Sequence, residues 1–382
     1  MEEKSLNSFF FDFTPMERSL RFVVRSFGEL QTGKYPDCND PYRIMSSLTP
    51  KMREAVLNNP SGYRIDEVCQ ILALDGNVVV GCTNPFSGRL LLDGEVVGCQ
   101  NGSTLYSHED YRKDNIGGEL FVQITNLHPT RNCYFAGISQ MAKGLYHVLK
   151  YTVFEFPRKI YLRKSHSVLQ AFLHSEKWWT MPLIWIADAL LWIHRQVICI
   201  HNSICYRKYT VEQMKVCPKE VEDIVMHDEH RFMELHDKAW FDWSLNYTIS
   251  EDPRTVRRLF VIKNQGKIEA FFLTKQEFFA KASSRGFKNV YLGSVMEWGI
   301  TSGSKIKEKD IALISLKYFD ANIDGIQYAT SDNIVSKYLR RWFFVGIGNA
   351  NIGVRIRSIK DSAIKDMNNW RVRIAGSDTV LN

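Results

Sequence analysis

The sequence predicts a mixed α/β protein with mixed sheets, made of two lobes that share one order of elements. In the first half, short apolar runs between residues 68 and 104 are separated by the hairpin signals Leu74-Asp75-Gly76 and Asp93-Gly94. A charged, glycine-containing turn and an apolar helix follow these runs. From Val221 onward an antiparallel meander is again followed by helix, strand, helix and strand. The length of 382 residues fits two such domains.

The first lobe is expected to begin with helices. Thr14-Pro15-Met16-Glu17 has the pattern of a capping box with proline at the first helical position, which predicts a helix to about Leu30. Thr49-Pro50 starts a second, short helix. The other predicted elements of this lobe are strands at 68–74, 78–81, 89–92 and 96–104, a strand near 133–136, a helix over 139–149, and strands at 151–156 and 159–162.

The second lobe repeats this plan with different residues, and we interpret it as a degenerate copy. Where the first lobe has its turn, this lobe has Thr301-Ser302-Gly303-Ser304-Lys305, which leads into no apolar helix directly. Its expected elements are a helix over 222–235, a hairpin of strands 258–263 and 268–274, a strand over 290–298, a helix over 307–319, a strand at 325–330, a helix over 334–342 and a strand over 345–357. The predicted domains are residues 1–164, an apolar helical connector at 165–217, and residues 218–382.

The connector contains an unusually apolar segment, residues 178–201. Asp188 and Arg195 interrupt it, so its uninterrupted apolar run falls short of the ~20 residues that span a bilayer. Three interpretations remain open: a buried helix between the lobes, an anchor at a membrane surface, and an oligomer contact. The buried helix is preferred, because a surface anchor requires a cationic polar face and few basic residues flank the segment.

Composition and charge exclude several classes of protein. Apolar residues make up 45% and charged residues 24% of the chain, as in ordinary globular domains. The net charge of +7 is modest and the basic residues are scattered, so an anionic ligand is expected and nucleic acid is not. The eight cysteines form no C-x-x-C pair, which predicts no metal site and reduced thiols in a cytoplasmic protein. The N-terminal residues lack the pattern of a signal peptide.

The stretch 106–151 carries the predicted chemistry. Its charged turn, residues 110–118, leads at once into an apolar run over 120–124 whose spacing fits a helix with one buried face. The free backbone N–H groups and the dipole at a helix start attract anions, and glycine lets a phosphate approach that backbone closely. Arg112 and Lys113 add positive charge. The turn is therefore predicted to hold a pyrophosphate.

This turn resembles the coenzyme A loop of the GNAT acyltransferase superfamily, whose pattern is (Gln/Arg)-x-x-Gly-x-(Gly/Ala). Here it reads Tyr111-Arg112-Lys113-Asp114-Asn115-Ile116-Gly117. Asn115 stands in place of the first glycine, and asparagine is the next best residue for a left-handed backbone. Asp114 is a second departure, because a carboxylate repels a pyrophosphate. The family's second signature, a tyrosine helix before an aromatic strand, reads Leu145-Tyr146-His147-Val148-Leu149-Lys150-Tyr151, with Lys150 in place of glycine.

The resemblance implies two GNAT-like lobes in tandem and the transfer of an acetyl or other short acyl group from coenzyme A (as acetyl-CoA) to an amine. The residues implied to bind coenzyme A, one molecule per chain, are Arg112, Lys113, Asp114, Asn115, Ile116, Gly117 and Gly118. The strand at about 95–105 is implied to splay from its neighbour and bind the pantetheine arm. Its Gly98 and Gly102 are compatible with that role and with a bulge. Tyr146 is implied to protonate the leaving thiolate.

The general base and the acceptor are less determined. Glu119, His108 and Glu297 are candidate bases, and Glu297 is expected to be the carboxylate best placed to meet an amine beside the aromatic residues of the second lobe. The acceptor is a small-molecule or peptide amine, and the oligomeric state is open. Two other functions remain in play: a non-catalytic binding or scaffold protein that keeps the fold, and a Fem-type aminoacyltransferase, whose usual helical arm is not found here.

Overall fold

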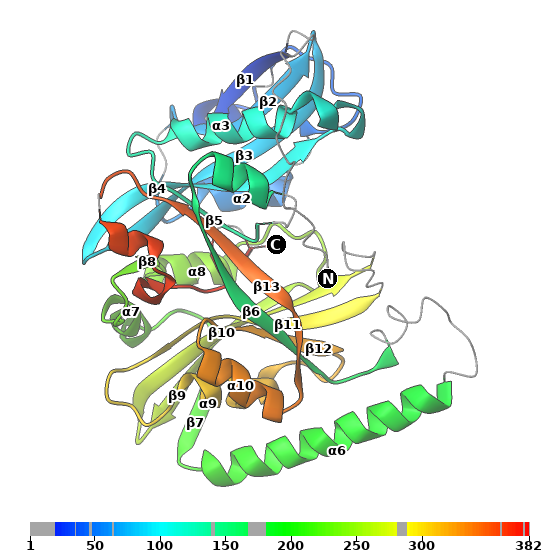
Figure 1. Cartoon of the computed structure of the whole chain (residues 1–382), viewed down its shortest axis with the longest axis vertical. Coiled ribbons are helices and arrows are strands. Elements are labelled where there is room, and N and C mark those ends of the chain that lie inside the picture. Colours follow the sequence, from blue (N-terminus) through cyan, green and yellow to red (C-terminus); the bar gives the residue numbers. More distant parts are fainter. Residues whose placement is uncertain are drawn as a thin grey trace, which may run out of the picture.

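The computed structural model shows a mixed sheet that runs through both lobes (Figure 1). It describes residues 20–34, 36–45, 48–62, 65–138, 142–166, 181–280, 289–359, 361–376 and 379–381. The first lobe occupies one end of the molecule, and the second lobe, with one long helix along its side, occupies the other. The predicted fold class, mixed α/β with two similar lobes in tandem, is confirmed.

The first lobe contains the predicted antiparallel meander. Its elements are β1 (Leu20–Ser26), α1 (Phe27–Gln31), α2 (Pro50–Leu57), β2 (Val68–Asp75), β3 (Val78–Leu92), β4 (Glu95–Ser107), the 3-10 helix η2 (Glu109–Asp114), α3 (Ile116–Leu127), β5 (Cys133–Ala136), α4 (Lys143–Val148) and β6 (Thr152–Leu162). The strands predicted at 78–81 and 89–92 form one continuous strand, β3, and those at 151–156 and 159–162 form β6.

The predicted N-terminal helix is wrong over the part of it that the structure describes. Residues 20–26 form β1, which pairs antiparallel with β2. Leu20, Val23 and Val24 have helical spacing, but β-branched valines favour extended backbone and the hydrogen bonds to β2 fix it. Helix begins only after Ser26, whose hydroxyl accepts a hydrogen bond from the Glu29 backbone N–H. Residues 14–19 lie outside the described part.

The second lobe repeats the order of the first. Its elements are α6 (Met181–Cys205), β7 (Tyr209–Met214), α7 (Lys219–Met226), β8 (Phe232–Glu234), α8 (Lys238–Asn246), β9 (Val256–Asn264), β10 (Lys267–Phe279), β11 (Val290–Ile300), α9 (Glu308–Ser315), η4 (Leu316–Tyr318), β12 (Gly325–Ala329), α10 (Asn333–Arg341), β13 (Phe344–Arg355), η5 (Ser362–Lys365), η6 (Met367–Asn369) and β14 (Trp370–Arg371). The helix expected over 222–235 ends at Met226, because residues 232–234 pair with β3 instead. β7 pairs with β9, so this lobe's sheet begins inside the predicted connector.

The two lobes exchange their last strands. In the described part of the chain the strand order is β1-β2-β3-β4-β5-β13-β6-β12-β11-β10-β9-β7. The first lobe's β6 therefore lies between β13 and β12, and the second lobe's β13 lies between β5 and β6. β13 and β6 pair antiparallel along most of their length, which joins the two halves through main-chain hydrogen bonds.

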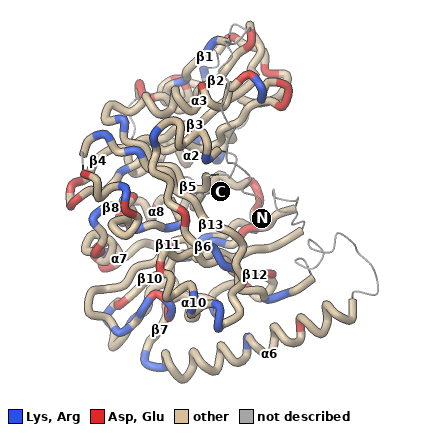
Figure 2. The backbone as a smooth tube through the Cα atoms, viewed as in Figure 1, with Lys and Arg blue, Asp and Glu red and all other residues tan. Residues whose placement is uncertain are grey.

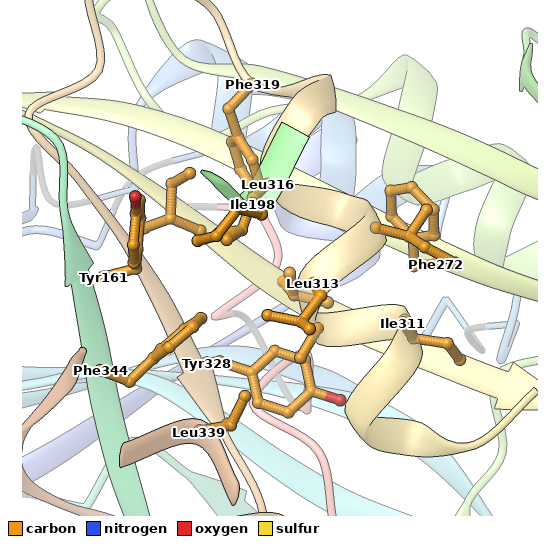
Figure 3. Packing of buried hydrophobic residues seen from close by; sticks show 14 of the residues in the cluster. Tyr161, Ile198, Phe272, Ile311, Leu313, Leu316, Phe319, Tyr328, Leu339 and Phe344 are labelled. Atoms are coloured by element: carbon orange, nitrogen blue, oxygen red, sulfur yellow. The ribbon is translucent and has the colours of Figure 1, made fainter. Parts of the chain in front are cut away.

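The core of the second lobe depends on this exchange. Tyr161 of β6 packs with Phe344 of β13 and with residues of α9, such as Leu313, in one buried cluster (Figure 3). Ile198 of α6 joins the same cluster and is 2% exposed. The first lobe has its own cluster around α3 and β5. Each lobe thus has a core, and the second core is completed by residues that precede residue 218.

The interpretation of residues 178–201 as a buried helix between the lobes is wrong for the residues described, which begin at Met181. α6 lies along the outside of the second lobe, away from the first (Figure 1). Ile184 and Ile198 are its buried residues. By length and composition α6 is also apolar enough to cross a membrane, and little of it is buried.

Candidate active site

The turn before α3 has the backbone that the sequence predicts. η2 leads into Asn115, whose φ of 55° is in the left-handed region, and α3 begins at Ile116. Lys150, which stands in place of glycine in the second signature, also has a positive φ, of 60°. Both positions where the resemblance expects glycine therefore have the backbone that glycine favours. This agreement supports the alignment of the two signatures with this chain.

The start of α3 is open to an anion. No side chain caps it, so the first backbone N–H groups of the helix remain available within the described structure. A Cβ atom added at Gly117 would meet nothing within 4 Å, whereas one at Gly118 would lie 2.4 Å from the Asn115 side-chain oxygen. Arg112 and Lys113 are exposed beside this opening. Geometry and charge together fit a phosphate group at Gly117.

The corresponding helix start in the second lobe is more acidic. α9 carries Glu308 and Asp310 in its first turn, and the Asp310 side chain accepts a hydrogen bond from the Lys307 backbone N–H at 2.9 Å. Acidic side chains in the first turn oppose the positive end of a helix dipole, and α9 has two of them where α3 has Glu119. The expectation of one coenzyme A per chain stays a prediction, and this difference between the lobes favours it.

The strand before the turn is bulged and splayed. Among the described residues, β4 is in register with β5 at Gln100↔Cys133 alone. Between the pairs Cys82↔Tyr106 and Asn84↔Ser103, β4 has one residue more than β3, and Thr104 there has a φ of 52°. A bulge of this kind turns the backbone away from the ladder and is common next to active sites.

The bulge is not at the glycines that the sequence singled out. A Cβ atom at Gly98 would lie 2.8 Å from the His128 ring, and one at Gly102 would lie 2.6 Å from the Phe135 ring. Both glycines are therefore required by close packing against side chains. The splayed strand that the resemblance implies is present, and its irregularity falls at Thr104.

Tyr146 lies in the core of the first lobe and is 6% exposed. Its ring centroid is 4.5 Å from that of Phe121, on α3, and 5.1 Å from that of Tyr151. The other side of the ring lies against Gly353 of β13, where an added Cβ atom would be 2.5 Å from the ring. Burial raises the pKa of Tyr146 well above its usual value, so the phenol keeps its proton at neutral pH. Its role as general acid stays a prediction.

Glu297 does not fit the role predicted for it. Its side chain is 0% exposed, and its carboxylate accepts a hydrogen bond from Arg371 at 2.8 Å and lies 2.6 Å from the His236 ring. Burial acts to raise the pKa of Glu297, but Arg371, His236 and Arg373 together lower it to about 2. A buried carboxylate that stays ionised is a poor base for an amine and meets no acceptor. Glu297 is therefore corrected to a structural ion pair.

The two other candidate bases lie nearer the turn. Glu119 is in the first turn of α3, and His108 stacks on Tyr42 at a centroid distance of 3.8 Å, next to η2. His108 is also 3.5 Å from Asp110. Both belong to the first lobe, and their role stays a prediction.

The sequence reasoning missed a cavity of about 830 Å³ between the lobes. Strands β5, β6, β10, β11, β12 and β13 contribute to its wall, which explains why no sequence motif announces it. Lys143 and Glu155 form an ion pair in the wall at 2.7 Å, and Lys275 and Glu277 form another at 2.8 Å. The Asn351 side chain donates to the Ile138 carbonyl at 3.0 Å, while its buried Oδ1 has no hydrogen-bond partner among the described residues. The wall is mixed: these polar groups, one of which can accept a hydrogen bond, stand among apolar side chains such as Phe156 and Leu292.

Comparison with known proteins shows what this arrangement resembles. No family model and no curated protein sequence matches the chain. Among solved structures, N-myristoyltransferase of Saccharomyces cerevisiae with bound myristoyl-CoA is 12% identical, with 89% of this chain and 80% of that chain covered and a TM-score of 0.55. The fold is that of the GNAT-like N-acyltransferases. A second structure of the yeast enzyme, with bound myristoyl-CoA and inhibitors, is 14% identical over 96% of this chain and 87% of that one, with a TM-score of 0.54.

A solved structure from another organism gives the same result. The GCN5-related N-acetyltransferase from Anabaena variabilis is 10% identical, with 89% of this chain and 73% of that chain covered and a TM-score of 0.51. At these identities the likeness establishes the GNAT-like fold, which agrees with the resemblance in the two signatures. The reaction has to be argued from the residues of this chain.

Proposed function

We propose that this protein transfers an acyl group from an acyl-CoA thioester to an amine. The observation that carries the proposal is the open start of α3 at Gly117, next to the bulged and splayed strand β4. An uncapped helix start with open space at its glycine leaves backbone donors and room for an anionic ligand.

The residues of the turn fit the pyrophosphate of coenzyme A. Arg112 and Lys113 would supply charge, and the backbone N–H groups of Ile116, Gly117 and Gly118 would supply directed donors. Asn115 holds the left-handed turn that aims these groups outward. Asp114 is the residue that fits least, because it adds negative charge. When bound, the thioester supplies an acyl carbonyl activated for attack by an amine.

Residues of the first lobe can assist that transfer. Tyr146 is the tyrosine of the second signature and lies against α3, so we assign it the role of proton donor to the leaving thiolate. The backbone at Thr104, turned out of the ladder by the bulge, is the donor that we assign to the developing oxyanion. Both assignments are proposals that rest on position in the first lobe.

The cavity between the lobes suits a polar acceptor. An amine donates hydrogen bonds, and Asn351 Oδ1, Glu155 and Glu277 are acceptors in its wall. We propose that a small-molecule or peptide amine enters here. We propose acetyl or another short acyl group as the one transferred, and the turnover comparison below tests its length. A cytoplasmic location stays part of the proposal, and the eight cysteines are free thiols.

The test combines binding with turnover. Calorimetry with coenzyme A is expected to show one site per chain. Arg112→Glu with Lys113→Glu should raise the Kd at least ~30-fold, because two charges are reversed beside the phosphates. The matched control is Lys305→Glu with Lys307→Glu, which makes the same change at exposed positions of the second lobe's turn and should leave the Kd unchanged.

Turnover is followed as free thiol released from acetyl-CoA and from myristoyl-CoA in the presence of a panel of small and peptide amines. We expect thiol release that depends on the amine and that is faster from acetyl-CoA than from myristoyl-CoA. Faster release from myristoyl-CoA would contradict the proposed acyl length. Coenzyme A binding at the first-lobe turn without turnover on any amine would favour the non-catalytic binding protein instead. No binding at that turn would refute the proposal.

A further inference from the structure

α6 exposes apolar side chains to solvent, whereas a surface helix of a water-soluble protein turns its apolar side toward the core. Its most exposed residues are apolar: Leu183, Trp185, Ile186, Leu190, Ile200 and Ile204 are each between 59% and 67% exposed. Asp188 and Arg195 are its only acidic and basic residues. In Figure 2 the helix is accordingly almost free of charge along its length. An apolar patch of this extent on a monomer marks an interaction surface.

The polar residues of α6 hold this orientation. Asp188 accepts a hydrogen bond from the Ser165 backbone N–H at 2.5 Å, and Asn202 donates to the Leu313 carbonyl at 2.9 Å. His194 lies 3.3 Å from the Tyr161 hydroxyl, between these two points. The helix cannot rotate its apolar side inward without breaking these contacts. Asp188 is held by Ser165, just after β6, and Asn202 is held by Leu313 of α9, ~20 Å away along the helix, so α6 lies along the molecule and does not leave it to cross a bilayer.

A cationic hollow lies between α6 and the second lobe. A cavity of about 400 Å³ between α6, β7 and η4 is lined by Arg163, Arg195, Arg207 and Lys317, and by no Asp or Glu among the described residues. Burial and the nearby charge of Arg195 together lower the pKa of Arg163 to about 10. Arg163 donates to the main-chain carbonyls of Leu316 and Asp320, and an anion in the hollow would meet the other three cations.

We propose that α6 docks the protein flat on a phospholipid bilayer that contains anionic lipid, with the hollow against a lipid phosphate. The apolar side would enter the boundary between headgroups and acyl chains, where tryptophans such as Trp185 and Trp192 are favoured. Exposed Arg207 and Lys208 follow the helix and add charge that complements an anionic surface. A second copy of the chain fits less well, because a symmetric contact would bring two cationic hollows together. This inference does not depend on the acyl-transfer proposal.

The test is co-sedimentation of the full chain with vesicles of phosphatidylcholine, with and without 30% phosphatidylglycerol. Binding is expected to the mixed vesicles, and to be roughly tenfold weaker without the anionic lipid. Trp185→Glu with Trp192→Glu should weaken binding roughly a hundredfold or more. The matched control is Ile65→Glu with Val148→Glu, which adds the same charge at first-lobe residues that are 66% and 54% exposed and should weaken binding far less.

Two further measurements separate the parts of the proposal. Arg207→Gln with Lys317→Gln should remove most of the preference for anionic lipid while keeping the binding that the apolar side provides. Tryptophan fluorescence of the unmodified chain should be quenched by vesicles with brominated acyl chains, which needs no variant to fold. Equal binding by the Trp185→Glu, Trp192→Glu variant, or no quenching, would overturn the proposal. The proposal would also be overturned by a dimer that forms without lipid, binds no vesicle and is dissociated by the Trp185→Glu and Trp192→Glu substitutions. A second copy of the chain would then cover α6.

Discussion

Substitutions at Gly117 should separate coenzyme A binding from folding. Gly117 is the second residue of α3, its φ lies outside the left-handed region, and a Cβ atom there would meet nothing within 4 Å. Gly117→Ala therefore fits the fold without strain. Because alanine favours helix over glycine, this variant should be more stable than the parent by about 0.5–1 kcal/mol. The same methyl group stands where a phosphate would approach the helix start.

The expected loss of binding can be bounded from the same geometry. If the methyl group removes one charge-assisted hydrogen bond to the phosphate, binding weakens by about 1.5 kcal/mol, or roughly tenfold. Gly117→Glu adds a like charge, which costs a further ~1–2 kcal/mol at a partly solvated distance of a few ångströms. Its Kd should therefore rise by roughly 100-fold or more. A glutamate in the first turn still favours the helix dipole, so folding should not suffer.

The assay is calorimetric titration with coenzyme A alongside urea unfolding of the protein without ligand. Stability that is unchanged or higher, together with affinity that falls in the order Gly, Ala, Glu, is the expected pattern. Gly303→Ala in the second lobe's turn is the control for affinity and should leave the Kd unchanged. Equal Kd values for all Gly117 variants would place the pyrophosphate elsewhere. A loss of stability in Gly117→Ala would show that the open space inferred at this position is wrong.

Three other substitutions test the remaining assignments. Arg371→Leu removes one of the cationic partners of the buried carboxylates of Glu297 and Asp228 and should cost about 3–5 kcal/mol in urea unfolding, against less than ~1 kcal/mol for Lys238→Leu in a more exposed pair. Burial raises the pKa of the Glu308 carboxyl to about 7, so its ionisation reduces the stability of the folded chain as pH rises from about 4.5 to 7. Glu308→Gln should therefore raise the Tm at pH 8.5 and change it little at pH 4. Tyr146→Phe keeps the buried ring and should lower turnover by roughly 100-fold or more with coenzyme A affinity unchanged, and equal turnover would leave the tyrosine a packing residue.

Local signals in the sequence were sufficient for most elements and for the turn. Hairpin turns such as Asp93-Gly94 and Asn264-Gln265-Gly266 fix their strands within a few residues, so the two meanders could be predicted one after the other. The left-handed backbone at Asn115 follows from a property of that residue and its neighbours. These features do not depend on distant parts of the chain.

Features that depend on distant partners could not be predicted in this way. Glu297 looked available because Arg371, which ion-pairs with it, is 74 residues away in sequence. The helical spacing in residues 20–24 is overridden by pairing with β2, some 50 residues later. The apolar segment of α6 looked like a core helix because the sequence shows how apolar a helix is and does not show which side faces the protein.

The exchange of β6 and β13 gives the last prediction, which concerns whether the lobes can be separated. A chain that ends at residue 165 keeps β6 but loses β12 and β13, the strands on both of its sides, and β5 also loses its pairing with β13. Tyr161 and Phe156, each 1% exposed, would lose their covering residues. Unpaired edges with exposed aromatic residues favour aggregation over folding. We therefore expect this fragment to be insoluble or to lack a cooperative thermal transition by circular dichroism, while co-expression with residues 166–382 should restore a soluble complex. A soluble monomeric fragment with a cooperative transition would show that the first lobe is an independent domain and that the exchanged strands add nothing essential to it.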